Sequence, residues 1–309
     1  MPSDMGGTVA GLLVVDKPEG MTSHDVVGRA RRALGTRKVG HAGTLDPMAT
    51  GVLVLGIGQA TRLLGLLALK DKSYEATIRL GQATVTDDRQ GDVLTIADEA
   101  VLVAVTDEAI AASLGAFVGV IEQRPSSVSA IKVDGRRAYD RVRAGEDVEL
   151  PARTVEIASI QLGAIHRSAD GIDVGITVTC STGTYVRAIA RDLGDALGVG
   201  GHLVQLRRTR VGAFSAAGAV SLDELEKRGR ECVLAMSAVV PSCFPVWHVT
   251  HEQARAVGSG LRIDYDGPAV EEPVAVVGPD GRFVAMAADE GGRARYLAVF
   301  VPAASKSGS

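Results

Sequence analysis

The chain has 309 residues, of which 46% are hydrophobic and 23% charged, and these values are ordinary for a globular protein that buries a sizeable core. No apolar run approaches the length of a membrane span, and the first residues lack the features of a signal peptide, so we expect a cytoplasmic protein without membrane association. The three cysteines, Cys180, Cys232 and Cys243, show no CxxC spacing, which indicates neither a disulfide framework nor a zinc site.

The net charge of −4 and the pI of about 5.9, taken alone, argue against a nucleic-acid partner. The charges are nevertheless grouped along the chain. Residues 81–122 carry a surplus of seven negative charges, whereas residues 1–80, 123–145 and 181–212 carry surpluses of three, four and three positive charges. Such blocks favour a basic groove on an acidic body, which would steer a polyanion to one face. Scattered solvated charge is the simpler alternative, and block counts alone do not exclude it.

The N-terminal region predicts a strand, a turn and a helix. The apolar run 11–15 precedes residues 16–20, whose proline and glycine are typical of a turn. Ser23 is a good N-cap for a helix, because apolar residues recur at helical spacing over 26–34. Lys17, before a rigid proline, suits a structural ion pair or a phosphate contact, although a solvated lysine is the simpler interpretation.

The segment Gly40–Gly51, with the sequence GHAGTLDPMATG, is predicted to be a loop that presents one carboxylate. Its glycines disfavour a helix, and Pro47 biases Asp46 toward an extended backbone. The apolar run 52–55 that follows predicts a buried strand. A surface turn is the simpler interpretation, but a single carboxylate held between glycines and a core strand favours a functional site.

The middle of the chain contains one conspicuous aromatic residue and one basic segment. Residues 73–81 alternate as a strand does, and Tyr74 stands out because aromatic residues make up only 4% of the chain. Core packing is the usual role of such a tyrosine, and stacking on a base is the alternative. Residues 107–118 predict an amphipathic helix. The basic segment at about 123–150 is either a solvated helix or an arm that grips phosphates.

Residues 154–162 and 172–180 predict two strands joined by a turn at 167–171, with Cys180 as a buried core thiol. Residues 203–210 predict a further strand, which passes from apolar to basic residues.

A polar, glycine-containing turn at 181–184 leads into a helix whose first turns carry Tyr185 and Arg187. A solvated Arg187 is the simpler interpretation. Alternatively, Arg187 orients a carboxylate through a bidentate pair, and Asp46 is the obvious candidate.

A domain boundary is predicted near residues 241–245. Short strands and tight turns follow, including a hairpin over 274–287 and a last strand at 298–301, so residues 245–309 predict a small β-rich module with a disordered tail from 303. The histidines of this region and His202 share no metal-ligand spacing, and no metal is expected.

Taken together, these motifs resemble the TruB family of bacterial tRNA pseudouridine-55 synthases over nearly the whole chain. The resemblance rests on six motifs in order: Asp16-Lys17-Pro18-x-Gly20-x-x-Ser23, Gly40-His41-x-Gly43-Thr44-Leu45-Asp46-Pro47-x-Ala49-x-Gly51, Lys72-x-Tyr74, Gln123-x-Pro125-x-x-Ser127-x-x-x-Ile131-Lys132, Gly183-Thr184-Tyr185-Val186-Arg187 and Leu206-Arg207-Arg208. It implies an α+β fold with a central mixed or antiparallel sheet flanked by helices. Residues 1–244 would be the catalytic domain, and residues 245–309 resemble a PUA RNA-binding domain.

The resemblance also implies a reaction. A uridine in the T loop of tRNA is isomerised without cofactor or metal: the N1–C1′ bond is cleaved, the uracil rotates, and C5 is joined to C1′. Asp46 is by resemblance the catalytic carboxylate, and Arg187 matches the arginine that pairs with it and keeps it ionised. Tyr185 belongs to the same motif as Arg187 and is expected at the substrate.

The other expected substrate-binding residues also follow from the family's motifs. Tyr74 matches the aromatic residue that stacks on the flipped uracil, and Leu206 matches an apolar pocket wall. His41 matches the residue that fills the space left by the flipped base. Lys17 matches a lysine near the pocket, for which we expect a structural role.

Two alternatives remain open at this point. One is an RNA-binding protein that mainly helps tRNA to fold, with catalysis secondary. The other is a relative that depends on a guide RNA and partner proteins, although such relatives often carry basic tails and this chain ends in Ser305–Ser309. We expect a monomeric enzyme that acts on the tRNA T stem-loop without guide RNA or protein partner.

Overall fold

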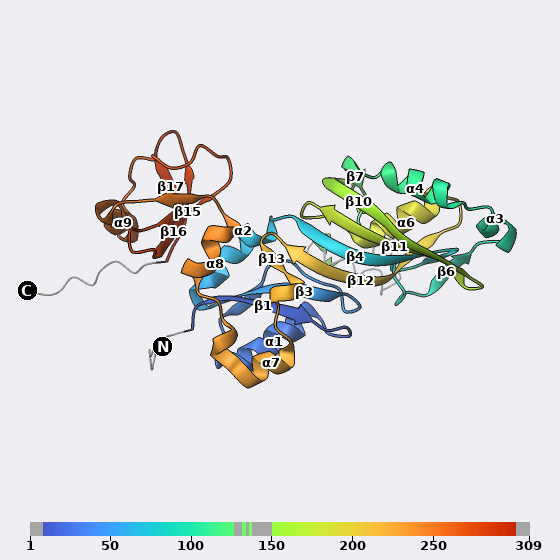
Figure 1. Cartoon of the computed structure of the whole chain (residues 1–309), viewed down its shortest axis with the longest axis horizontal. Coiled ribbons are helices and arrows are strands. Elements are labelled where there is room, and N and C mark those ends of the chain that lie inside the picture. The colour runs from blue at the N-terminus through green and yellow to red at the C-terminus, as the bar shows by residue number, and fades with distance from the viewer. Residues whose placement is uncertain (1–8, 127–131, 134–135, 138–149, 301–309) are drawn as a thin grey trace, which may run out of the picture.

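The computed structural model describes residues 9–126, 132–133, 136–137 and 150–300 (Figure 1). Most of the basic segment predicted at about 123–150, and the predicted disordered tail, lie outside these residues. Within them, no helix has the length and apolar character needed to cross a membrane.

A mixed sheet forms the body of the molecule. Its main path among the described residues runs β1 (Gly11–Lys17), β3 (Thr50–Ile57), β12 (Gly201–Val211), β4 (Lys72–Leu80), β11 (Gly171–Cys180), β10 (Arg153–Ser168) and β7 (Gly119–Gln123), with β2 (Val39–His41) on β3 and β13 (Phe214–Ser215) on β12. The contact of β3 with β12 is a short parallel one, and the other pairs on this path are antiparallel. The predicted α+β class is confirmed.

Helices cover the two halves of this sheet separately. Helix α1 (Ser23–Leu34) and α7 (Leu222–Arg228) pack near β1 and β3, while α4 (Asp107–Gly115) and α6 (Val186–Ala196) pack over the half that contains β4, β10 and β11 (Figure 1). Because β3 and β12 pair over only two residues, the two halves meet along a narrow seam. The loop that carries Asp46 ends at this seam.

Smaller elements complete the described part of residues 1–244. They are α2 (Leu64–Ala68), α3 (Glu99–Val103), α8 (Met236–Cys243), the 3-10 turns at Gly58–Leu63, Ala216–Gly218 and Gly229–Cys232, and the strand pairs β5 (Gln82–Thr84) with β6 (Val93–Ile96) and β8 (Lys132–Val133) with β9 (Arg136–Arg137).

Most local predictions are confirmed, although the last described strand covers Ala294–Val299 and not 298–301, α4 ends at Gly115 and not at residue 118, and the N-cap of α1 needs a correction. The hairpin expected at 154–180 is present as β10 and β11, and Cys180 is buried. The N-cap of α1 is Thr22 rather than Ser23, because the Thr22 hydroxyl accepts the Asp25 N–H while the Asp25 carboxylate accepts the Thr22 N–H. Two adjacent hydroxyl residues made the cap ambiguous by one position. Because Thr22 caps the helix, the Ser23 hydroxyl is available for another contact.

The C-terminal module is β-rich, as predicted. Its sheet has the order β14 (Val246–His248), β15 (Val274–Val277), β16 (Phe283–Asp289) and β17 (Ala294–Val299), with α9 (His251–Gly258) beside it, at one end of the molecule (Figure 1). One core cluster nevertheless crosses the predicted boundary. It includes Val52 and Val54 of β3 together with Phe283, Met286 and Phe300 of the module.

Candidate active site

Asp46 lies in the loop between β2 and β3, and its neighbours are fixed by side chains from other elements. The freed Ser23 hydroxyl accepts the Leu45 N–H at 2.9 Å and donates to the Leu45 carbonyl at 3.2 Å. Lys17 Nζ donates to the Pro47 carbonyl at 3.3 Å and to two carbonyls of the turn after β1. Lys17 is fully buried, and this burial lowers its pKa to about 8. It therefore supports the loop from behind, through backbone carbonyls.

Arg208 binds the other side of the same loop. This buried side chain of β12 donates to the carbonyls of Gly43 at 3.1 Å, Thr44 at 3.4 Å and Val52 at 2.7 Å. The backbone of Arg208 approaches Gly51 closely: a Cβ added at Gly51 would lie 2.2 Å from the Arg208 carbonyl oxygen. Gly51 also has a φ of +100°. Only glycine fits this position without strain, because it has no Cβ and tolerates positive φ. The glycines of the loop thus allow a buried arginine to hold it.

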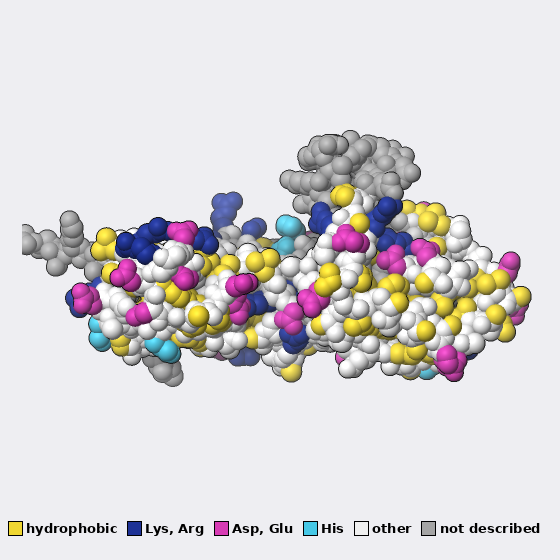
Figure 2. Space-filling model, turned by 90° about the horizontal axis from the view of Figure 1, so that it is seen from above, with side chains coloured by type: hydrophobic (Ala, Val, Ile, Leu, Met, Phe, Trp, Pro, Cys, Tyr) yellow, Lys and Arg dark blue, Asp and Glu magenta, His cyan; other side chains and the backbone are white. Residues whose placement is uncertain are grey.

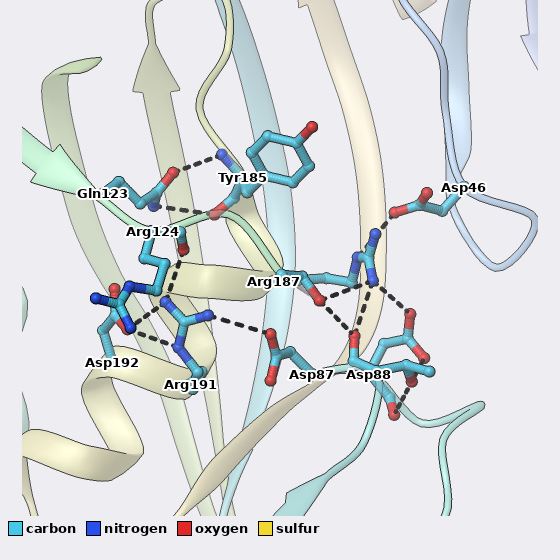
Figure 3. Close-up of polar contacts among 11 residues, drawn as sticks. Asp46, Asp87, Asp88, Gln123, Arg124, Tyr185, Arg187, Arg191 and Asp192 are labelled. Atoms are coloured by element: carbon cyan, nitrogen blue, oxygen red, sulfur yellow. Dashed lines mark hydrogen bonds and ion pairs between the residues drawn. The ribbon is translucent and has the colours of Figure 1, made fainter. Parts of the chain in front are cut away.

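The loop presents its carboxylate to Arg187, which is the second residue of α6. Arg187 Nε lies 3.0 Å from Asp46 Oδ2; the arginine side chain is 6% exposed and the aspartate side chain 37% (Figure 3). Arg187 and Asp46, which the sequence analysis paired, therefore lie in contact through Nε and one carboxylate oxygen. A buried guanidinium thus lies directly beside the partly exposed carboxylate.

Further contacts of the Arg187 guanidinium hold it in place. Nη1 donates to the Thr86 carbonyl at 2.8 Å and to Ser126 Oγ at 3.2 Å, and it lies 3.7 Å from Asp88 Oδ2 (Figure 3). Asp88 is almost completely buried. The sequence analysis did not single out Asp88, which lies in the acidic block 81–122, and the adjacent Asp87 is the one local signal of a further role.

A cavity of about 290 Å³ opens beside the Asp46–Arg187 pair, near the lower limit of sizes typical of small-ligand sites. Five of the seven predicted site residues line it: Asp46, Tyr74, Tyr185, Arg187 and Leu206. Tyr74 of β4 and Leu206 of β12 come from two paired strands and supply the apolar wall of the cavity. Burial raises the pKa of the Tyr74 phenol, so this ring is uncharged. A flat apolar ring and a charged carboxylate thus share one small space.

Two cations that the sequence analysis did not single out also line the cavity: Lys72 and Arg208. Lys72 Nζ donates to the carbonyls of Ala68 at 2.9 Å and Lys70 at 2.7 Å, and burial lowers its pKa to about 8. Both residues belong to motifs that carried the resemblance, but the local sequence gave no reason to place them together. Their charge suits a polyanionic ligand.

His41 lies outside the cavity lining, at the end of β2. Its ring meets the edge of the His24 ring at a centroid distance of 5.4 Å and an angle of 85°. Partial burial lowers the pKa of His41, which favours the neutral imidazole. A neutral ring beside the loop is suited to contact with an unstacked base.

The chemistry of the site is that of a single carboxylate. Within the described ranges, no group of three or more His, Cys, Asp or Glu residues could hold a metal ion. A carboxylate at the edge of a partly open cavity can act as a nucleophile or as a general base. The aromatic and aliphatic walls can hold a planar ring next to it.

Two solved structures share this fold. A chain of a Cbf5–Nop10–Gar1 complex matches with a TM-score of 0.71 at 27% identity, covering 95% of this chain and 85% of that chain. A chain of an H/ACA ribonucleoprotein bound to a substrate RNA containing 2′-deoxyuridine matches with a TM-score of 0.71 at 26% identity, covering 95% and 86%. The sheet order, with one arginine-paired aspartate at its seam, has the architecture of a pseudouridine synthase.

Family models and relatives are more specific. Residues 31–186 match the TruB family pseudouridylate synthase N-terminal domain, residues 187–235 the tRNA pseudouridylate synthase B C-terminal domain, and residues 244–301 the tRNA pseudouridine synthase II C-terminal domain. The tRNA pseudouridine synthase B of Arthrobacter sp. strain FB24 is 50% identical over 97% of this chain and 99% of its own. That of Mycolicibacterium paratuberculosis is 52% identical over 95% and 98%. The chain belongs to the TruB family of pseudouridylate synthases, which confirms the resemblance.

Proposed function

We propose that this protein isomerises uridine 55 in the T loop of tRNA to pseudouridine, with Asp46 as the catalytic carboxylate. The observation that carries the proposal is the Asp46–Arg187 pair at the edge of a cavity walled by Tyr74 and Leu206. Membership of the TruB family, and relatives named tRNA pseudouridine synthase B, support the reaction and the substrate.

The position of Asp46 beside a small cavity requires the target nucleotide to leave its stack. A uridine inside a folded loop cannot bring C1′ and C5 to a carboxylate in a small cavity, so the base must be flipped out. In the proposed roles, Tyr74 contacts the flipped uracil, Leu206 and Tyr185 bound the pocket, and His41 contacts the RNA beside it. Lys17 does not contact the substrate in this proposal; it supports the loop that carries Asp46.

We further propose that the enzyme is a cytoplasmic monomer that needs neither guide RNA nor partner protein. Residues 1–244 would carry catalysis, and residues 245–309 would form a PUA-like RNA-binding module. The basic segment at about 123–150 stays a predicted RNA-gripping insertion. Relatives named tRNA pseudouridine synthase B align with nearly the whole of this chain, and this supports an enzyme that acts alone.

The test is tritium release from an unmodified tRNA transcript labelled at C5 of its uridines, incubated with the purified protein alone. We expect stoichiometric release from the T loop, because C5 exchanges its hydrogen for the bond to C1′. A transcript with cytidine at position 55 should release none. Absence of release from the normal transcript without added factors would contradict the proposal.

A further inference from the structure

Gln123, the last residue of β7, uses both ends of its side-chain amide on a single neighbour. Its Oε1 accepts the Tyr185 backbone N–H at 2.8 Å, and its Nε2 donates to the Tyr185 carbonyl at 3.1 Å (Figure 3). The side chain is only 2% exposed. Such a two-point contact resembles the pairing of two strands, but it is made by a side chain.

The contact lies at the first turn of α6. Tyr185 is the N-cap residue of this helix, and its side chain makes no capping hydrogen bond. Its carbonyl accepts the N–H groups of Ala188 and Ile189, which begin the helical ladder. The Gln123 amide therefore fixes the residue from which α6 starts, in place of an ordinary side-chain cap.

Arg187 follows only two residues later, so the same contact fixes the position of its backbone. Residues Thr182–Arg187 all line the cavity, which makes this short stretch a wall of the site as well as the start of the helix. A shift of Tyr185 would move both the wall and the guanidinium that meets Asp46. Misplacement of a positioned group by about 1 Å can cost about 100-fold in rate.

Two further contacts join the end of β7 and the residues just after it to the same helix. Ser126 Oγ accepts from Arg187 Nη1 at 3.2 Å, and the Arg124 carbonyl accepts from Arg191 Nη2 at 2.8 Å. These contacts hold side chains of α6, whereas Gln123 holds its backbone. These contacts fix the position of α6 relative to β7. Strand β7 in turn pairs with β10, where Arg153 lies opposite Gln123.

We propose that Gln123 is a positioning residue of this enzyme: it sets the first turn of α6 so that Arg187 reaches Asp46. The inference rests on the proposed function. The amide is essential to it, because the contact needs a donor and an acceptor at once. An ionised carboxylate would present an acceptor to the Tyr185 carbonyl and repel it, whereas a protonated carboxyl group could make both hydrogen bonds.

This requirement gives a direct test with Gln123→Glu. Burial raises the pKa of a carboxyl group, so the introduced acid should titrate between about pH 5 and 8.5. The ratio of variant to wild-type kcat should be near one at the acid end and fall by about 10- to 100-fold as the group ionises. KM for tRNA should change much less. The charged groups around this turn, Asp88, Arg187, Arg191 and Asp192, are the same in both proteins, so taking the ratio removes what they contribute to both profiles.

Two comparison variants complete the experiment. Gln123→Ala should lower kcat by about 10- to 100-fold at every pH, because neither hydrogen bond can be restored. Gln161→Glu, an exposed position on β10, adds the same charge and should follow the wild-type profile. Circular dichroism and thermal unfolding of each variant give the folded fraction, so that kcat refers to folded enzyme. If Gln123→Ala does not fold, the pH profile of Gln123→Glu decides.

A pH-independent kcat ratio for Gln123→Glu, or wild-type kcat in Gln123→Ala, would overturn the inference. Failure of the proposed function would look different, since the wild-type protein would then release no tritium. A loss confined to KM would also overturn the inference, because it would place Gln123 in RNA binding and not in the alignment of Arg187.

Discussion

The backbone on both sides of Asp46 is bound by side chains from the end of β1, from α1 and from β12. Ser23 fixes Leu45, Lys17 fixes Pro47, and Arg208 fixes the residues before them. The carboxylate is therefore held in place before a substrate arrives. Such preorganisation lowers the reorganisation needed at the moment of reaction.

Arg187→Lys should separate the charge of this residue from its geometry. An ammonium group is a point charge and cannot contact Asp46, the Thr86 carbonyl and Asp88 together as the guanidinium does. We expect single-turnover pseudouridine formation to fall by about 10- to 100-fold, with the Kd for tRNA nearly unchanged.

The matched control is Arg167→Lys, whose exposed arginine pairs with Asp107 on the surface. An exposed pair contributes little, so this variant should have wild-type rates. If Arg187→Lys also reacted at the wild-type rate, the guanidinium geometry would have no part in catalysis.

Lys17 predicts a pH dependence of stability. Burial lowers its pKa from 10.5 to about 8 in the folded protein. Between these values the unfolded chain holds a proton that the folded protein has released, so this group makes the free energy of unfolding rise with pH. Lys17→Met lacks this contribution. The free energy of unfolding of the wild type minus that of the variant should therefore grow above pH 8, as measured by urea unfolding at several pH values. A constant difference would contradict the lowered pKa of Lys17.

At the scale of elements, the seam between β3 and β12 explains why the loop ends in glycine. Gly51→Ala would place a Cβ 2.2 Å from the Arg208 carbonyl oxygen at a φ of +100°. We expect a loss of about 1–3 kcal/mol in unfolding free energy, and a lower kcat because Arg208 would shift. Gly65→Ala in α2 is the control, since nothing lies within 4 Å of its Cβ and alanine favours the helix. Equal stability of the two variants in urea would contradict the account.

The elements themselves could be predicted from the sequence because each depends on a local pattern. The alternation in β4 and β11 and the helical periodicity of α1 required no knowledge of distant residues. The pairing of Asp46 with Arg187 was a hypothesis that the resemblance strengthened. The support by Ser23 and Arg208 was not foreseen, because these side chains bind backbone carbonyls and amides that have no sequence signature.

At the scale of the whole molecule, the charge blocks correspond to different regions. The acidic block 81–122 contains β6 and α3, which lie at the end of the molecule opposite the C-terminal module (Figure 1). Figure 2 shows groups of Lys and Arg side chains along one long edge, reaching from the C-terminal module to the catalytic region. This distribution favours the predicted basic face over scattered charge.

The shared core predicts that the whole chain unfolds as one unit. Phe300 packs in the same cluster as Val52 and Val54, and the Arg62 guanidinium lies 4.4 Å from the centre of its ring. Calorimetry of the full chain should show a single transition. Phe300→Ala should lower it as a whole, by about 3–5 kcal/mol of unfolding free energy. Two separate transitions, with only one shifted by the variant, would show that the module folds independently.

Asp46→Asn tests the central claim most directly. The change keeps the shape of the side chain and removes its charge, so the loop contacts of Ser23, Lys17 and Arg208 should persist. We expect the purified variant to form no detectable pseudouridine in an unmodified tRNA transcript, while its Kd for tRNA stays within a few-fold of wild type. Pseudouridine formation by the folded variant at the wild-type rate would contradict the assignment of Asp46 as the catalytic carboxylate.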